Sequence, residues 1–138
     1  MGWLDLLPHQ PPMRLLEEVL SVSPGVAAVG RRTAKRDDFY FQGHFPHDAI
    51  VPAVILVEMV AQTGGLAAGA PSAGESQAPV QLRVAGIGPF KFPAAARPGA
   101  VLEASARVVG KIGGLYKIEG AVTADGIVVA TGSLTLAG

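Results

Sequence analysis

The spacing of hydrophobic positions changes along this chain. From Ala53 the sequence runs AVILVEMVAQTGGLAA, in which nearly every position is apolar. Pro52 stands where the first turn of a helix tolerates a proline, because an N–H there has no helical partner. An apolar run with no polar face predicts a helix that is buried on all sides, with its second half weakened by Gly64 and Gly65.

Runs rich in valine, leucine and alanine lie on both sides of this helix and predict strands. Before it, residues 13–22 and 25–34 are separated by the turn signal Ser23-Pro24-Gly25, which indicates an antiparallel hairpin. Residues 3–7 are expected to form only a short helical turn. After the helix we expect three or four strands, at 80–87, 100–109, 115–123 and 127–136.

Glycine and proline mark the connections between these runs. Asp125-Gly126 is a strong signal for a tight hairpin, and Gly113-Gly114 is expected to turn the preceding pair of strands. Residues 70–79 and 93–99 are predicted to be loops. Residues 39–52 contain a glycine and prolines that exclude both a regular helix and a central strand.

One apolar helix among antiparallel strands predicts an α+β fold, in which a curved sheet wraps around the helix and buries it. The 138 residues fit a single domain, 1–138, and contain no repeat. Charged residues make up only 16% of the chain, against about 25% in ordinary soluble domains. The low charge leaves much of the surface apolar, which indicates subunit contacts, a tunnel or both.

The charge balance narrows the classes of partner. Eleven basic residues balance eleven acidic ones, so neither nucleic acid nor a membrane surface is indicated. The absence of cysteine excludes disulfides and cysteine nucleophiles. The N-terminal sequence lacks a signal-peptide pattern, so the cytoplasm is the expected location. The charged residues around Arg32 and Asp38 are expected to form a solvated strand end followed by a loop.

Glu58 is the most informative residue, because it lies within the apolar helix. An unpaired, ionised carboxylate there is strongly disfavoured, and desolvation favours the neutral form. A carboxyl group kept protonated near neutral pH is what a general acid requires. Gln62 lies one turn further along the same helix face, where its amide can orient the carboxyl group. The alternative is a structural carboxylate paired with an arginine.

His44 is the second candidate for chemistry. It follows Gly43, which permits an unusual backbone, and it precedes Phe45-Pro46, which stiffens the segment. An imidazole on a rigid, irregular segment near an apolar helix is a candidate general base. The alternative is an incidental loop histidine, and we assign His9 and His47 no catalytic role.

No pattern in the sequence indicates a metal or a cofactor. His44 and His47 are three residues apart, but Pro46 between them excludes a helical metal-binding face. Neither a phosphate-binding loop nor a GxSxG nucleophile motif occurs. We therefore expect acid–base chemistry without a cofactor.

The segment GHFPHDAIVPAVILVEMVAQ resembles the signature of the bacterial 3-hydroxyacyl-[acyl-carrier-protein] dehydratases, the single-domain hotdog enzymes of type II fatty acid synthesis. It contains GHFP, a loop with a proline, and an apolar helix with an acid and a glutamine four residues later. The spacing between His44 and Glu58 agrees with this family. LLPHQPPMRLLEEV, AGIGPFKF and GLYKIEGAVTADGIVVATGSL resemble further family segments, so the likeness covers most of the chain.

This resemblance implies a hotdog fold and an obligate homodimer, often three dimers in a hexamer, with active sites shared across the dimer interface. It implies that His44 of one subunit is the base and Glu58 of the other is the acid in dehydration to the trans-2-enoyl thioester. Glutamate rather than aspartate implies the branch that does not isomerise its product. A backbone N–H at the helix start is implied to stabilise the thioester oxygen. Here Ala53 replaces the family's glycine, which keeps the N–H and adds a methyl group.

The resemblance also implies a substrate carried on the phosphopantetheine arm of acyl carrier protein, which is an acidic partner. Lys91, Arg97 and Arg83 are candidates for a local basic patch, with scattered surface charge as the alternative. Phe41 and Phe45 are weaker candidates for contacts with the substrate or carrier.

Two other classes of function stay open. One is a hotdog hydratase or thioesterase that acts on CoA esters or on specialised lipid or polyketide thioesters. The other is a non-catalytic hotdog subunit, which the presence of both His44 and Glu58 disfavours. Turnover of one 3-hydroxyacyl group on carrier protein and on CoA distinguishes the enzymes.

Overall fold

In the computed structural model, residues 2–71 and 82–138 are described, and they form one α-helix, six strands and two short 3-10 helices. In chain order the elements are η1 (Trp3–Leu6), β1 (Glu18–Ser23), β2 (Ala27–Thr33), η2 (Phe39–Phe41), α1 (Ala53–Gly69), β3 (Arg83–Lys91), β4 (Val101–Ile112), β5 (Leu115–Ala124) and β6 (Ile127–Ala137).

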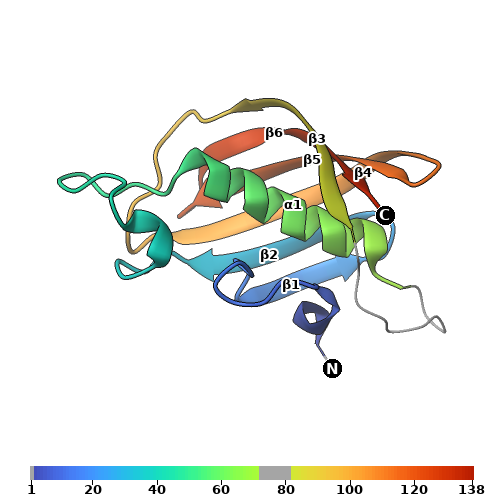
Figure 1. Cartoon of the computed structure of the whole chain (residues 1–138), viewed down its shortest axis with the longest axis horizontal. Helices are drawn as coiled ribbons and strands as arrows, with labels where there is room; N and C mark the ends of the chain where they lie inside the picture. The colour runs from blue at the N-terminus through green and yellow to red at the C-terminus, as the bar shows by residue number, and fades with distance from the viewer. Residues whose placement is uncertain (1, 72–81) are drawn as a thin grey trace.

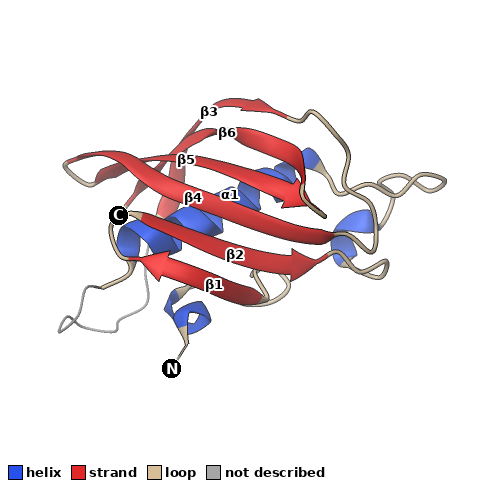
Figure 2. Ribbon diagram, turned by 180° about the vertical axis from the view of Figure 1, so that it is seen from behind, coloured by secondary structure: helices blue, strands red, loops and turns tan. Residues whose placement is uncertain are grey.

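The six strands form a single sheet in the order β1-β2-β4-β5-β6-β3, and every neighbouring pair is antiparallel. The helix α1 lies along one face of the curved sheet, and the sheet covers it when seen from behind (Figures 1 and 2). This is the hotdog arrangement, so the predicted α+β fold is confirmed.

Alternation along the central strand β4 explains why the helix lies on this face. Leu102, Ala104 and Ala106 are buried, whereas the residues between them are exposed. Side chains of successive strand residues point to opposite faces, so the small and apolar residues all meet α1. The opposite face of β4 carries Glu103, Ser105 and Arg107.

The prediction that α1 is buried on all sides is wrong for its first half within one chain. Val54 is 73% exposed, and Val57 and Glu58 are only partly buried. From Met59 to Ala67 every helix residue is buried. An apolar pattern shows that a helix face avoids water, but it does not distinguish burial in the same chain from burial against another molecule.

The glycines of α1 do not interrupt the helix, which continues to Gly69. A methyl group on Gly64 would lie 2.9 Å from Ile118 Cγ2, and one on Gly120 of β5 would lie 2.6 Å from Val60 Cγ1. Real side chains do not approach that closely, so both glycines are needed for the short distance between helix and sheet.

The predicted hairpins are confirmed, with changed boundaries. Asp125 and Gly126 have φ values of 50° and 87°, as a tight turn between antiparallel strands requires. The expected strand at 80–87 corresponds to β3, which continues to Lys91. Residues 80 and 81 and most of the predicted loop 70–79 lie outside the described residues.

The first predicted strand begins five residues later than expected, at Glu18 rather than Met13. The backbone of Met13 and Leu15 bonds instead to the side chain of Gln62. Short-range patterns do not reveal this partner, because it lies 47 residues or more away in the sequence.

Across residues 2–71 and 82–138, no helix combines the length and the hydropathy needed to cross a membrane.

Candidate active site

Glu58 lies on the partly exposed face of α1, where its side chain is 26% accessible. Two groups approach the same carboxylate oxygen, Oε2. The Gln62 amide donates a hydrogen bond to it over 2.8 Å, and Nε2 of His9 lies 3.6 Å from it. Within the described part of the chain, no hydrogen bond to the other carboxylate oxygen, Oε1, is found.

Gln62 uses both ends of its amide. Its Oε1 accepts a hydrogen bond from Leu15 N over 2.9 Å, and its Nε2 donates to Met13 O over 2.7 Å. The side chain is almost fully buried, with 1% of the residue exposed. A buried amide with these partners has a fixed orientation. Gln62 is therefore placed where its amide can orient Glu58, as the sequence leads us to expect.

His44 lies on the irregular segment that precedes the helix. Its Nδ1 is 3.3 Å from Ile50 O, and its ring stacks on that of Phe45 at 4.2 Å between centroids. A carbonyl oxygen only accepts hydrogen bonds, so this contact requires the hydrogen on Nδ1. The lone pair is then on Nε2, which is the state that a general base needs.

Backbone hydrogen bonds hold the segment that carries His44. Gly43 has a φ of 79°, in the left-handed region that favours glycine. Ile50 N donates to His44 O over 3.1 Å, and Val51 N donates to Ala96 O over 2.8 Å. The segment is therefore tied both to itself and to the loop that follows β3.

His44 and Glu58 do not meet within one chain. No hydrogen bond or ion pair joins them among residues 2–71 and 82–138. The His44 ring contacts Ile50 O, which precedes α1 in the sequence. Glu58 lies five residues after Ala53, the first residue of the helix. A rise of about 1.5 Å per residue places the Glu58 backbone roughly 7 Å further along the axis than Ala53.

The start of α1 presents free backbone donors. Pro52 occupies the N-cap and Ala53 is the first helical residue. The first N–H groups of a helix have no partner inside the helix, and the helix dipole adds positive charge there. Ala53 is exposed, so its N–H is available to an oxygen atom that develops negative charge.

The residues considered for carrier binding do not form one basic patch in a single chain. Arg83 and Lys91 are at opposite ends of β3, roughly 26 Å apart at about 3.3 Å per residue. The Arg97 guanidinium forms an ion pair with Asp48 beside the segment that carries His44. Phe41 is buried in the core at 7% exposure, whereas Phe45 is 50% exposed.

The expectation that Arg32 and Asp38 lie in a solvated strand end and loop is wrong. They form an ion pair over 2.9 Å with side chains only 12% and 9% exposed, and Tyr40 donates a hydrogen bond to Asp38 over 2.7 Å. Burial alone would raise the pKa of Asp38, but hydrogen bonds from Tyr40, Arg32 and the Lys35 N–H outweigh it and hold that pKa below its usual value. Burial and the bond to Asp38 raise the pKa of the Tyr40 phenol.

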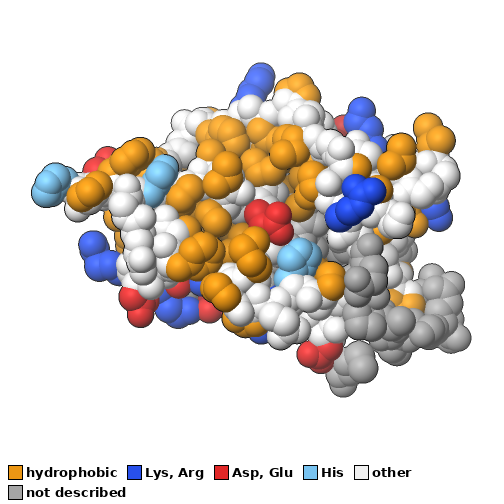
Figure 3. Space-filling view, in the orientation of Figure 1, with side chains coloured by type: hydrophobic (Ala, Val, Ile, Leu, Met, Phe, Trp, Pro, Cys, Tyr) orange, Lys and Arg blue, Asp and Glu red, His pale blue; other side chains and the backbone are white. Residues whose placement is uncertain are grey.

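The surface over α1 is hydrophobic. Figure 3 shows apolar side chains gathered on the face where α1 lies in Figure 1. Val54 of the helix, Ile87 of β3 and Phe92 beyond its end are 73%, 62% and 42% exposed. Exposed apolar patches of this kind mark contact surfaces for another molecule.

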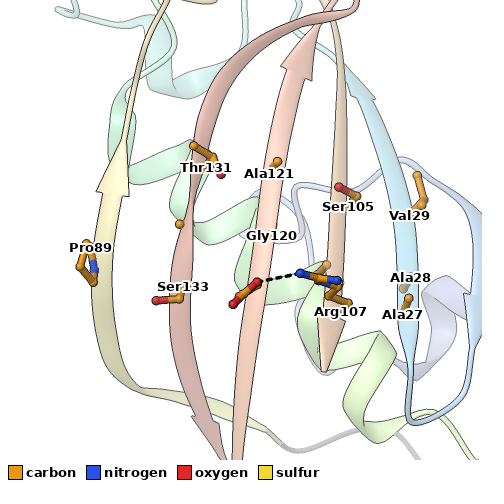
Figure 4. A pocket seen from close by; sticks show the side chains of 13 residues that line it. Ala27, Ala28, Val29, Pro89, Ser105, Arg107, Gly120, Ala121, Thr131 and Ser133 are labelled. Atoms are coloured by element: carbon orange, nitrogen blue, oxygen red, sulfur yellow. Dashed lines mark hydrogen bonds and ion pairs between the residues drawn. The ribbon is translucent and has the colours of Figure 1, made fainter. Parts of the chain in front are cut away.

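The other face of the sheet has a hollow of about 610 Å³. It is lined mainly by small residues of β2, β4, β5 and β6 (Figure 4). Arg107 donates to Glu119 over 2.9 Å across it. Neither His44 nor Glu58 reaches this hollow. In the part of the chain that the structure describes, no three metal-ligating side chains cluster.

Comparison with known proteins assigns the family. The family model described as a FabA-like domain matches residues 7–133. The 3-hydroxyacyl-[acyl-carrier-protein] dehydratase FabZ of Roseiflexus castenholzii is 36% identical over 134 residues, which cover 97% of this chain and 92% of that protein. This chain belongs to the FabZ dehydratase family. The FabZ of Caldicellulosiruptor bescii is 31% identical over 134 residues, which cover 97% of this chain and 94% of that protein.

Solved structures agree on the fold. The dehydratase heterocomplex ApeI:P from Xenorhabdus doucetiae aligns with a TM-score of 0.75 and 23% identity over 97% of this chain and 89% of that chain. An uncharacterized protein, PH1136 from Pyrococcus horikoshii, aligns with a TM-score of 0.69 and 15% identity over 96% and 89%. At these identities the likeness concerns the hotdog fold alone.

Proposed function

We propose that this chain removes water from a 3-hydroxyacyl thioester carried by acyl carrier protein, giving the trans-2-enoyl thioester in fatty acid biosynthesis. The observation that carries the proposal is the carboxyl group of Glu58, which Gln62 fixes on an exposed apolar helix face. Membership of the FabZ family supplies the reaction class.

The reaction balances with two side chains and no cofactor. Nε2 of His44 takes the C2 proton, which leaves the electron pair to form the C2–C3 double bond. Glu58 gives its proton to the C3 hydroxyl, which departs as water. Negative charge on the thioester oxygen is stabilised by the Ala53 N–H at the helix start. The substrate loses one water molecule, and the proton taken by His44 must return to Glu58, directly or through solvent, before the next turnover.

The proposed site combines His44 of one subunit with Glu58 of another. Three features support this: no hydrogen bond or ion pair joins the two residues within the described chain, β3 is an edge strand, and Val54 of α1 and Ile87 of β3 are exposed. An exposed edge strand pairs readily with a second copy. A homodimer is the minimum assembly that this site needs, and a trimer of dimers is compatible with it.

Acyl carrier protein is the proposed donor of the substrate. Lys91 ends β3 just before the loop that contacts Val51, so it is a candidate contact for the acidic carrier. Arg97 is a weaker candidate, because Asp48 already compensates its charge. Arg83 lies at the opposite end of β3 from Lys91. The cytoplasmic location of the protein stays a prediction.

A substrate comparison tests the reaction. One 3-hydroxyacyl group is offered on acyl carrier protein and on CoA, across several chain lengths, and formation of the enoyl product is followed. We expect kcat/KM to be higher on the carrier protein. Equal or better turnover of the CoA ester would favour the CoA-dependent alternative, and hydrolysis without an enoyl product would favour a thioesterase.

Mixing inactive variants tests the shared site. His44→Ala and Glu58→Gln are each expected to abolish dehydration while the protein stays folded. When the two are mixed and reassembled, hybrid dimers contain one intact site, so activity should return to a measurable fraction of the wild-type value. No recovery in hybrids verified by mass spectrometry would place both residues in the same subunit.

A further inference from the structure

His9 lies against Glu58, although the two are 49 residues apart in the sequence. Its Nε2 is 3.6 Å from Glu58 Oε2, and the two side chains are 27% and 26% exposed. Nδ1, the other ring nitrogen, is buried and has no hydrogen-bond partner in the part of the chain that the structure describes. One ring nitrogen of His9 is therefore buried in the protein, and the other lies beside the Glu58 carboxyl group.

The burial of Nδ1 determines which neutral tautomer costs less. A hydrogen on Nδ1 would be a buried donor without an acceptor, whereas a bare Nδ1 leaves only an unused lone pair. The favoured tautomer carries its hydrogen on Nε2. The imidazole then presents an N–H donor to Oε2 of Glu58.

Gln62 holds both partners of this contact. Its amide bonds to Glu58 and also to the backbone of Met13 and Leu15, which belong to the segment that begins with His9. Leu7, two residues before His9, is buried at 4% exposure. The backbone is thus anchored on both sides of the histidine, which keeps this segment beside Glu58.

The contact differs from an ordinary hydrogen bond in its length. The two atoms are 3.6 Å apart, and a closure of less than 1 Å would bring them within hydrogen-bonding distance. Catalytic hydrogen bonds are often long in the free enzyme and shorten when substrate binds.

We propose that His9 is a positioning residue for Glu58. When its Nε2–H closes on Oε2, it joins the Gln62 amide as a second donor there, which makes Oε2 the carbonyl-type oxygen of the protonated acid. The transferable proton is therefore on Oε1, to which no hydrogen bond is found among the described residues. After the transfer, the same two donors stabilise the new carboxylate. This role rests on the proposed function of Glu58 as the general acid.

Two substitutions of similar polarity separate positioning from packing. In His9→Gln, the side-chain amide nitrogen reaches about as far as Nε2 and can still donate to Oε2. In His9→Asn, the amide is one bond shorter and its nitrogen falls near the position of Nδ1. His47 provides the matched control, because it is exposed and is not part of the site.

The readout is steady-state dehydration of a carrier-bound 3-hydroxyacyl group, with thermal melting as the check on folding. For His9→Asn we expect kcat to fall at least tenfold with KM changed less than about twofold, since a donor to a charged group is lost. His9→Gln should keep at least about a third of the wild-type kcat. His47→Asn should match the wild type.

Two outcomes overturn the positioning role. A wild-type kcat in His9→Asn would show that no donor is needed, and an equal loss in both variants would assign His9 to packing. Glu58→Gln in the same assay tests the proposed function separately. If that variant stays active, or if the wild type does not dehydrate the substrate, the role of Glu58 fails and the role of His9 fails with it.

Discussion

Gln62 joins Glu58 to the N-terminal segment through one side chain. Its amide nitrogen donates to Glu58 Oε2 over 2.8 Å and to Met13 O over 2.7 Å, and its amide oxygen accepts from Leu15 N over 2.9 Å. Gln62, one helical turn from the candidate acid, therefore also fixes the N-terminal segment that lies beside Glu58. This arrangement links the stability of the chain to the geometry of the site.

Replacing Gln62 by leucine should therefore lower both stability and activity. The substitution leaves the buried Leu15 N without a partner, which costs about 1–3 kcal/mol, and it also removes the bond to Met13 O. The kcat should fall more than KM rises, because Glu58 loses its orientation. Urea unfolding and dehydration kinetics measure the two effects.

Thr63→Val is the matched control for Gln62. Thr63 is the neighbouring buried residue, and among residues 2–71 and 82–138 its hydroxyl bonds only to Met59 O in its own helix. We expect less than about 1 kcal/mol of destabilisation and an unchanged kcat. If Gln62→Leu and Thr63→Val behave alike in the kinetic assay, Gln62 has no role in orienting Glu58.

A proline at position 53 should remove the proposed backbone donor without breaking the helix. Proline is tolerated at the first helical position, and Pro52 before it has φ −58° and ψ 141°, a conformation that a following proline allows. Loss of one such donor costs about 10²–10³ in kcat. Ala53→Pro should show this loss, whereas Ala53→Gly should keep the wild-type kcat. Retained activity in Ala53→Pro, with helicity verified by circular dichroism, would exclude this N–H as the donor.

The buried pair of Arg32 and Asp38 should make stability depend on acidity. The pKa of Asp38 is held below its usual value in the folded chain. The unfolded chain therefore binds the proton more readily, with a pKa of about 3.9. The stabilisation is present above that pH and is lost as the pH falls through the lower pKa of the folded state.

Asp38→Asn should flatten this acid dependence. The variant should be less stable than the wild type by about 3 kcal/mol at pH 7, because Arg32 loses its buried partner, and by much less at low pH. Urea unfolding across the acid range measures the difference. Glu17→Gln is the control, because Glu17 also has a lowered pKa but its side chain is 36% exposed. An equally steep acid limb in Asp38→Asn would contradict the assignment.

A charge on the edge strand should separate the subunits. Ile87 of β3 is 62% exposed beside the apolar face of α1, so Ile87→Lys would bury a charge in the proposed interface. We expect a monomer by light scattering and loss of dehydration. Ile127, at the start of β6, is 64% exposed and provides the control. If Ile127→Lys dissociates the protein and Ile87→Lys does not, the interface is not at β3.

Local patterns in the sequence were sufficient to predict features that depend on residues close together in the chain. The turn at Asp125-Gly126 follows from two adjacent residues that tolerate positive φ. The helix that starts after Pro52 follows from a proline and an apolar run. The pairing of Glu58 with Gln62 follows from a spacing of one helical turn.

Contacts between distant segments were not predictable in this way. His9 meets Glu58 because Gln62 draws the N-terminal segment onto α1, and nothing near His9 in the sequence indicates this. The burial of Arg32 and Asp38 likewise depends on Tyr40 and on the backbone of Leu15. Val54 is exposed because the described part of the chain does not cover this face of α1, which the sequence of the helix does not reveal.

The close approach of α1 to the sheet at Gly64 and Gly120 limits which residues can change the acyl-chain preference of the enzyme. Ile118, Val60 and Leu134 fill the space between the layers and are at most 1% exposed, so longer side chains there would disturb folding. In the proposed dimer, the acyl chain must then be accommodated along the seam between subunits. Preference for short or long acyl groups can therefore change through residues at that seam, such as Val54 and Ile87, while the folding core stays the same.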